Sequence, residues 1–507
     1  MPHNLGFKSL AKKMIPIEKG EWKKVAPLLG LKFLVGTIHV ILAQLKEPLI
    51  VTLKDSGPEV IPVIKAWVIF PLAIFCAFGY SKLSNVCKRS TLFYTIISLF
   101  LVIIALYGFV LYPYADFFSP TQSADWLAAH LGKQHNHVIS IYRYWMHTLF
   151  FATAELWGQV VILTLYWSFA NHIFQVHEAK RTYTLFTAAS DIGSIVAPML
   201  VLYYSQKDHL HTVQTMVTYS IFFGGLILFI YWWVQKYVLS DTRYYDPSKM
   251  THSVNEKTKL SLSKSIKHIL ASKYLFAIGA IVISVALTAN IVEVVWRAHL
   301  KELCPDVGSY QRFLAKKSLC VGIGAFTIVL LFGSSSLRRF GWKFTAQLSP
   351  IVMGGTSVIF FLLCIFKEQL SFFAQFFSLT SLSLIVYFGA FQAVTNKIMK
   401  YSFFDPTKEM VYIPLDQESK IKGKAAIEMI GSRLGKSGSS WIQLIVIEII
   451  GTGSILSGSS FLLPITLAVI TLWLYSTNYL DRKMMVKEQQ KARKVFEKGA
   501  GTQELPT

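Results

Sequence analysis

Charged side chains occur inside long apolar segments of this chain. Glu155 lies in the run FFATAELWGQVVILTLYWSF, well inside the predicted membrane segment 142–172. An ionised side chain at the centre of a bilayer costs about 2.5–3.5 kcal/mol on insertion scales, and from this depth Glu155 cannot extend to water. We therefore expect Glu155 to face the interior of a helix bundle, with a cation or a proton as its partner. A buried structural pair is the alternative to a functional role.

Two more charged positions stand near the ends of apolar segments. Glu293 and Arg297 are four residues apart, so they share one helix face and can pair; either they line a cavity or they form a local ion pair at a helix end. Lys46 stands beside Glu47 and before Pro48. Proline interrupts the helical hydrogen bonds, so we expect irregular backbone there, tolerated near a membrane when it is buried or lines water. A lysine at the membrane interface is the alternative.

The strongest signal for an anion is the run KGKAAIEMIGSRLGKSGSSWIQLIVIEII. Arg433 and Lys436 are three residues apart and share one helix face, and Lys422 and Lys424 precede them. Four cations at the start of a predicted span require a negatively charged partner. The same run has four glycines, which allow membrane helices to approach closely: Gly423, Gly431, Gly435 and Gly438.

Motifs of soluble catalysis are missing from the sequence. GSRLGKSG is not a phosphate loop, because that motif has four residues between its glycines and follows a strand, whereas Gly431 and Gly435 enclose three residues in an apolar helical context. There is no HExxH or GxSxG pattern, and the five scattered cysteines form no CxxC pair. His130, His135 and His137 lie in a polar loop without cysteines, which is a weak zinc signal. We expect no enzyme activity, no cofactor and no metal ion.

The elements that must position these charges are membrane helices. The chain is 53% hydrophobic and 15% charged, whereas a soluble chain carries about 25% charged residues. A span needs about 20 mostly apolar residues, and twelve segments qualify in two sets of six. The first set is 27–46, 60–80, 91–113, 142–172, 184–205 and 213–238; the second is 274–300, 318–336, 344–366, 372–396, 425–450 and 459–480.

The predicted fold is an all-α membrane protein with twelve transmembrane helices in two six-helix bundles, like the major-facilitator transporters. The net charge of +22 could indicate nucleic acid, but the basic residues gather in alternate loops, as they do on the cytoplasmic side. We therefore expect no nucleic-acid partner and two cytoplasmic termini. The predicted domains are an N-terminal segment 1–26, bundles 27–238 and 274–480, a linker 239–273 and a charged, partly disordered tail 481–507. Glycine-led, cation-ended turns at 79–89 and 333–343 suggest that the bundles are repeats.

Several stretches together resemble one family. They are ELWG (155–158), WSFANHIFQVHEAKRTYTLF (167–186), YVLSDTRYYDP (237–247), NIVEVVWRAHLK (290–301) and DPTKEMVYIPLDQESKIKGKAAIEMIGSRLGKSGSSWIQ (405–443). They are similar to signatures of the ADP,ATP carriers of chlamydiae, rickettsiae and plastids, over almost all of residues 20–485. The resemblance implies a major-facilitator-like nucleotide transporter. It also implies that the family's essential charges correspond to Lys46, Glu155, Glu293, Lys422 and Lys424.

The sequence departs from the ATP/ADP exchangers of that family. Residues 43–48 read Ala-Gln-Leu-Lys-Glu-Pro where the exchangers have Arg-Asp-Thr-Lys-Asp-Thr, and the chain has His172 for glutamate, Arg297 for lysine and Asp191 for asparagine. With fewer fixed charges in the first span and a new acid in the fifth, net import of several nucleotides with protons becomes plausible. Candidates for the coupling carboxylate are Glu155, Asp191 and Glu293.

We therefore expect a monomeric carrier of the bacterial inner membrane that works by alternating access, with the nucleotide bound between the two bundles. Glu155 and Glu293 would hold the cations while the site is empty. A strict ATP/ADP antiporter is the alternative within the family, and a phosphate-binding lipid flippase or a membrane enzyme is the alternative of a different class. The cations that would neutralise the phosphates are Lys46, Arg297, Lys422, Lys424, Arg433 and Lys436.

Overall fold

The computed structural model describes residues 20–500, apart from 175, 207, 242, 246–271, 333–334, 377, 413–414, 416–426, 428–430 and 452. Every regular element in these residues is a helix. The chain divides into two compact units: unit 1 is Met1–Glu256 with Cys304–Ile323, and unit 2 is Lys257–Leu303 with Gly324–Thr507. The helix α16 (Val307–Phe332) therefore contributes its first part to unit 1 and its last part to unit 2.

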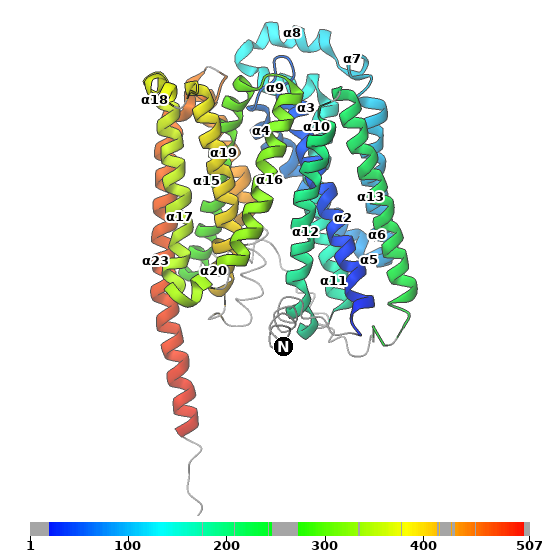
Figure 1. Ribbon diagram of the computed structural model, residues 1–507, viewed down its shortest axis with the longest axis vertical. Coiled ribbons are helices and arrows are strands. Elements are labelled where there is room, and N and C mark those ends of the chain that lie inside the picture. The colour runs from blue at the N-terminus through cyan, green and yellow to red at the C-terminus, as the bar shows by residue number, and fades with distance from the viewer. Residues whose placement is uncertain are drawn as a thin grey trace, which may run out of the picture. The chain divides into compact units, whose positions relative to one another are not determined.

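Unit 1 is built around α2, which packs against α12 and α13 (Figure 1). Its other long helices are α5 and α6, and the shorter α10 continues through the π-helical segment η4 into α11. The elements are α2 (Trp22–Lys46), α3 (Pro48–Val51), α4 (Val60–Val63), η1 (Ile64–Ile69), α5 (Phe70–Val86), α6 (Arg89–Leu106), η2 (Tyr107–Leu111), α7 (Ala115–Phe118), α8 (Thr121–Leu131), η3 (Lys133–His135), α9 (Asn136–Arg143), α10 (Trp145–Leu156), η4 (Trp157–Tyr166), α11 (Trp167–Ile173), α12 (Val176–Tyr204) and α13 (His209–Tyr237).

Unit 2 repeats these neighbour relations around α15. There α15 packs against α22 and α23, and α17 packs against α23, as α6 packs against α13 in unit 1. This correspondence is what parallel repeats of a transporter produce. The elements are α15 (Lys273–Leu303), α17 (Ser335–Ile365), α18 (Ser371–Phe376), α19 (Ser381–Met399), η5 (Lys400–Phe404), α20 (Asp405–Met410), α22 (Ser432–Ile450), η8 (Leu456–Gly458) and α23 (Ser459–Ala500).

Small residues bring the central helices of each unit together. A Cβ atom on Gly193 of α12 would lie 2.6 Å from the Thr37 hydroxyl oxygen of α2. In unit 2, a Cβ atom on Gly435 of α22 would lie 2.6 Å from the Ala286 Cβ and 3.0 Å from the Ile283 carbonyl oxygen of α15. Glycine at such positions allows the backbones to approach, as is common between membrane helices.

Ten helices in the described part of the chain are long and apolar enough to cross a membrane. The predicted spans 318–336 and 425–450 are not among them. The helices at these places, α16 and α22, carry charged and small polar side chains and adjoin residues outside the described ranges. The prediction of an all-helical membrane protein is confirmed, while the exact number of twelve stays a prediction, as do the domain boundaries. The second repeated turn begins at residues 333–334, which are outside the described residues.

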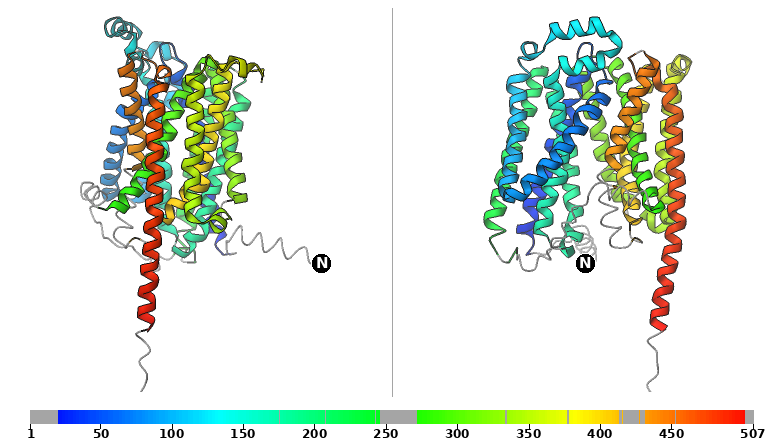
Figure 2. Two further views of the ribbon diagram at one scale, coloured as in Figure 1. Left: turned by 90° about the vertical axis from the view of Figure 1, so that its left-hand side faces the viewer. Right: turned by 180° about the vertical axis from the view of Figure 1, so that it is seen from behind.

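One predicted boundary in unit 2 is wrong. The tenth span begins at Ser381 and not at 372, because the Thr380 hydroxyl accepts a hydrogen bond from the Ser383 N–H and caps α19 there. In the tail, α23 continues as a helix to Ala500, and residues 501–507 are outside the described residues, so partial disorder of the tail stays a prediction. Its sequence is rich in Lys, Glu, Gln and Ala, which are strong helix formers. Figure 2 shows α23 extending beyond the other helices of its unit.

Candidate functional site

Lys46 and Glu155 form an ion pair inside unit 1. Lys46 is the last residue of α2, and its ammonium donates a hydrogen bond to the carboxylate of Glu155 in α10. The ammonium also lies 4.8 Å from the ring centroid of Phe151, one turn before Glu155. Just beyond, the indole N–H of Trp157 donates to the Val35 carbonyl oxygen of α2 at 3.1 Å and fixes α10 against α2. The lysine side chain is 6% exposed and the glutamate side chain 23%.

The backbone after Lys46 is more regular than predicted. Only Glu47 separates α2 from α3, and its φ of −76° and ψ of −52° are helical. Pro48 is the first residue of α3, where the N–H that proline lacks would not be bonded within the helix in any case. The expected irregular, charged segment is therefore a short interruption in a nearly continuous helix.

Glu293 and Arg297 form the predicted pair in α15 of unit 2. The guanidinium Nη2 lies 3.0 Å from the carboxylate Oε1, and the side chains are 4% exposed for Arg297 and 24% for Glu293. The neighbouring Trp296 donates its indole N–H to the Val386 carbonyl oxygen of α19 at 2.9 Å, so this turn of α15 has a fixed orientation. Both pairs thus have a buried cation covered by a more accessible carboxylate. An anion would reach the cation by displacing the carboxylate.

The cations of the predicted eleventh span are only partly described. Lys422 and Lys424 are outside the described residues, whereas Arg433 is half-buried and Lys436 exposed on α22. Gly435 packs on Ala286, which puts Arg433 and Lys436 roughly 9–14 Å before Glu293 along α15, at about 1.5 Å per residue. Among the described cations of unit 2, Arg297 therefore lies at one depth along α15, and Arg433 and Lys436 lie at another.

Two buried lysines of α2 were not among the predicted site residues. Lys24 is 3% exposed, and its ammonium lies 2.7 Å from a Glu178 carboxylate oxygen. Lys32 is 5% exposed, with its ammonium 4.9 Å from the ring centroid of Tyr166 and 5.0 Å from that of Trp167. Desolvated cation–π contacts are worth about 2 kcal/mol each. Lys32 lies inside the predicted span 27–46 but near its start, where a lysine can reach the interface, so depth alone did not single it out.

Asp191, the remaining predicted residue, lies in α12 with an exposed side chain. It is within electrostatic range of Lys32. Each of the three carboxylates considered for proton coupling therefore has a cation nearby in its own unit.

The family model of the TLC ATP/ADP transporters matches residues 2–484. The chain belongs to this family. It is 35% identical over 499 residues to ADP,ATP carrier protein 1 of Chlamydia pneumoniae, covering 96% of each chain. It is 36% identical over 482 residues to the chloroplastic ADP,ATP carrier protein 2 of Arabidopsis thaliana, covering 93% of this chain and 76% of the relative.

Solved transporters share the fold of this TLC family member. A bacterial homologue of the iron transporter ferroportin in an inward-facing state has a TM-score of 0.56 at 12% identity, covering 90% of this chain and 98% of its own. The nucleoside transporter NupG has a TM-score of 0.51 at 10% identity, covering 89% and 98%. The predicted family and the major-facilitator-like fold are confirmed. The chain is a multi-pass membrane transporter and not an enzyme.

In this TLC transporter, the departure at His172 is accommodated by a contact with the start of the linker. The Tyr245 hydroxyl lies 3.1 Å from the His172 Nε2. Nearby, the guanidinium of Arg243 donates two hydrogen bonds to Asp241, at 3.0 and 2.7 Å, and these hold the pKa of Asp241 down to about 2. The described residues of the stretch SDTRYYD, 240–241 and 243–245, therefore contact the end of α11 through Tyr245.

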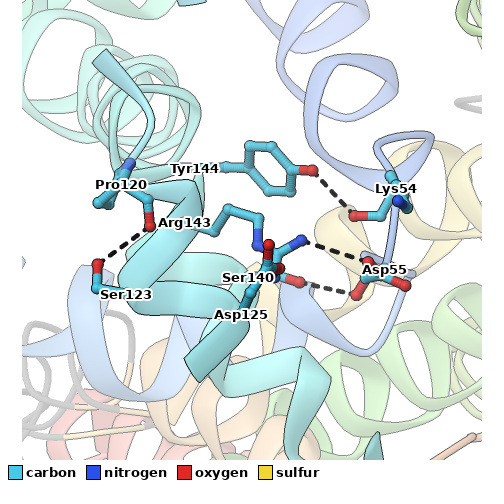
Figure 3. A network of polar contacts seen from close by, with 8 residues as sticks. All are labelled: Lys54, Asp55, Pro120, Ser123, Asp125, Ser140, Arg143 and Tyr144. Atoms are coloured by element: carbon cyan, nitrogen blue, oxygen red, sulfur yellow. Dashed lines mark hydrogen bonds and ion pairs between the residues drawn. The ribbon is translucent and has the colours of Figure 1, made fainter. Parts of the chain in front are cut away.

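A second polar network fixes the loop between η2 and α10 (Figure 3). Arg143 of α9 is nearly buried, and its guanidinium pairs with Asp125 of α8 and, at 3.3 Å, with Asp55. The Ser140 hydroxyl donates to the Asp55 carbonyl oxygen at 2.9 Å, and the Tyr144 hydroxyl donates to the Lys54 carbonyl oxygen at 3.0 Å. Asp55 has a φ of +56°, a conformation that aspartate tolerates better than most residues. The loop is thereby tied to the turn that follows the first span.

Proposed function

We propose that this transporter carries nucleotides, in particular nucleoside di- and triphosphates such as ATP and ADP, across the bacterial inner membrane by alternating access. The observation that carries the proposal is the family match over residues 2–484, together with curated relatives named as ADP,ATP carriers. The charges support it, because a nucleotide is an anion and each unit has a buried cation paired with a carboxylate.

The proposed mechanism is an exchange of anionic partners. While the carrier is empty, Glu155 neutralises Lys46 and Glu293 neutralises Arg297. Phosphate oxygens then compete for these cations, and the planar guanidinium of Arg297 can offer two parallel donors. A buried cation is costly without a counter-charge, so the empty carrier retains its carboxylate partners until a phosphate replaces them. Lys422, Lys424, Arg433 and Lys436 add positive charge for the rest of the phosphate chain.

The coupling we propose is net import with protons, on the strength of the altered residues 43–48 and the additional carboxylate Asp191. Glu155, Asp191 and Glu293 are the candidate proton carriers. Strict ATP/ADP exchange is the competing reaction within the family. We further propose a monomer with both termini in the cytoplasm, surrounded by lipid and without a nucleic-acid partner.

The first prediction is that liposomes containing the purified protein accumulate a radiolabelled nucleoside di- or triphosphate. If import is proton-coupled, uptake should occur without internal nucleotide, rise with an inward proton gradient and fall with an uncoupler. Uptake that requires preloaded nucleotide and ignores the gradient identifies an exchanger instead. Counterflow of labelled ATP separates both reactions from lipid flipping, which would move a labelled phospholipid and leave ATP outside.

Empty liposomes and liposomes with heat-denatured protein are the controls for leakage and surface binding. Uptake no greater than in these controls across the common nucleotides would contradict the proposed function.

The second prediction concerns the span-eleven cations. Arg433→Ala or Lys424→Ala should raise the KM for a nucleoside triphosphate about tenfold or more, and that for a monophosphate much less, because a lost charge-assisted hydrogen bond costs about 1.5–3 kcal/mol. The ratio of the two KM values is measured in liposomes. The matched control is Lys367→Ala, which removes a lysine paired at 3.1 Å with Glu302 at an exposed position. Unchanged triphosphate KM values in both variants would make these cations structural or topological.

A further inference from the structure

Lys32 is a buried cation in the middle of α2 for which the proposed clamp has no role. Its ammonium lies over the rings of both Tyr166 and Trp167, at 4.9 and 5.0 Å from their centroids. Tyr166 is buried at 2% exposure, and its hydroxyl donates to the Leu28 carbonyl oxygen of α2 at 3.1 Å. The rings therefore hold the ammonium in place, but they are neutral and do not cancel its positive charge.

Asp191 is a carboxylate within electrostatic range of Lys32. It is exposed although it lies within the candidate membrane span Leu185–Tyr204. Aspartate has one methylene group and cannot extend to the interface as lysine does. Charged side chains within a membrane span face a water-filled cavity or the bundle interior rather than lipid. We therefore expect Asp191 to face water rather than lipid, and it is within electrostatic range of the buried Lys32.

Lys32 and Lys46 occupy similar faces of α2. At 100° per residue their directions differ by roughly 40°, and at about 1.5 Å per residue they are roughly 21 Å apart along the axis. The close approach of Gly193 to Thr37 fixes the register of α12 against α2 near Asp191. Unit 1 thus has two buried cations at different depths, each beside a more accessible carboxylate: Lys46 with Glu155, and Lys32 with Asp191.

We propose that Lys32 is a second phosphate-binding position of the transport path, and that Asp191 is its counter-ion while that position is empty. This inference rests on the proposed nucleotide transport and adds a specific ligand to it. The phosphate chain binds the Lys32 ammonium and replaces Asp191 as its counter-ion. Tyr166 and Trp167 hold the ammonium in position.

The test compares two variants that should change the KM for a nucleoside triphosphate in opposite directions. In proteoliposomes, Lys32→Gln should raise the triphosphate KM about tenfold and the monophosphate KM less, and Lys32→Arg should retain most uptake because it keeps the charge. Asp191→Asn should lower the triphosphate KM severalfold, because it removes the anion that competes with the phosphates. The matched control is Lys236→Gln: Lys236 also lies over two rings, Trp232 and Tyr237 at 5.1 and 5.4 Å, but it is exposed at the end of α13.

A structural role for Lys32 predicts a different result. Lys32→Gln and Asp191→Asn would then both lower the melting temperature of the purified carrier and reduce uptake of all nucleotides in parallel, and that outcome would overturn the proposal. Because Asp191 is exposed, Asp191→Asn should fold even if Lys32→Gln does not, and a raised KM in that variant alone is enough to reject the counter-ion role. If liposomes with the wild-type protein take up no nucleotide, the proposed function itself is rejected. If wild-type uptake is normal and Lys32→Gln leaves the kinetics unchanged, only the role of Lys32 as a second phosphate-binding position is rejected.

Discussion

Nucleotide uptake should fall at least about a hundredfold when Lys46 is replaced by glutamine. The substitution keeps a polar, unbranched side chain but removes the positive charge, and it leaves Glu155 without the cation that it binds. Removing one partner of a buried ion pair costs about 3–5 kcal/mol, and each 1.4 kcal/mol corresponds to a factor of ten. The uncompensated carboxylate also repels the phosphates. Initial uptake rates of labelled ATP in liposomes, at equal protein incorporation, measure the effect.

Exchanging the charges of Lys46 and Glu155 distinguishes an effect on substrate binding from an effect on folding. The double variant Lys46→Glu with Glu155→Lys restores an ion pair between α2 and α10, so its melting temperature should recover, but the cation is now on the other helix and uptake should stay low. Lys367→Gln, at the exposed pair with Glu302, should behave as the wild type. Wild-type uptake by Lys46→Gln would show that Lys46 is not a substrate ligand.

The second large effect is expected at Gly435 of α22. In Gly435→Ala the new methyl group would lie 2.6 Å from the Ala286 Cβ and 3.0 Å from the Ile283 carbonyl oxygen, and neither atom can rotate away. The helices α15 and α22 must separate, which should destabilise the protein by about 1–3 kcal/mol, as overpacking does. Since Arg433 is on the same turn of α22, uptake should fall as well.

Gly438→Ala is the matched control on the same helix. Its methyl group would meet only the Leu287 Cδ2, at an ordinary distance of 3.7 Å. Replacing a helical glycine by alanine there should be neutral or stabilise the protein by up to about 1 kcal/mol. Thermal unfolding in detergent compares the two variants, and equal melting temperatures would contradict the tight approach of α22 to α15.

The sequence could predict contacts between residues close together in the chain, but not contacts between residues far apart in it. The Glu293–Arg297 pair was predictable because a helix places residues i and i+4 together. Glu155 was predictable as a buried charge, but its partner was not, because hydropathy contains no information on which helices are neighbours. The pairing of Lys46 with Glu155 follows only from the packing of α10 on α2.

The remaining errors have local causes. The boundary at Ser381 depends on a single threonine cap, which hydropathy averages out. The helices α16 and α22 are long enough to cross a membrane but carry polar side chains, so hydropathy alone does not identify them as membrane spans. Lys32 was missed because a lysine near the end of a predicted span can reach the interface, and only the contacts with Tyr166 and Trp167 show that it does not.

The Arg143 network bears on how the loop between η2 and α10 behaves during transport. All of its members, from Lys54 and Asp55 to Asp125 and Arg143, belong to unit 1. We therefore expect the loop to move together with unit 1 and not as a separate flap. Trp126 is 61% exposed on α8, so a spin label can be attached there. The label would report the motion of unit 1 during transport without altering the proposed substrate-binding residues.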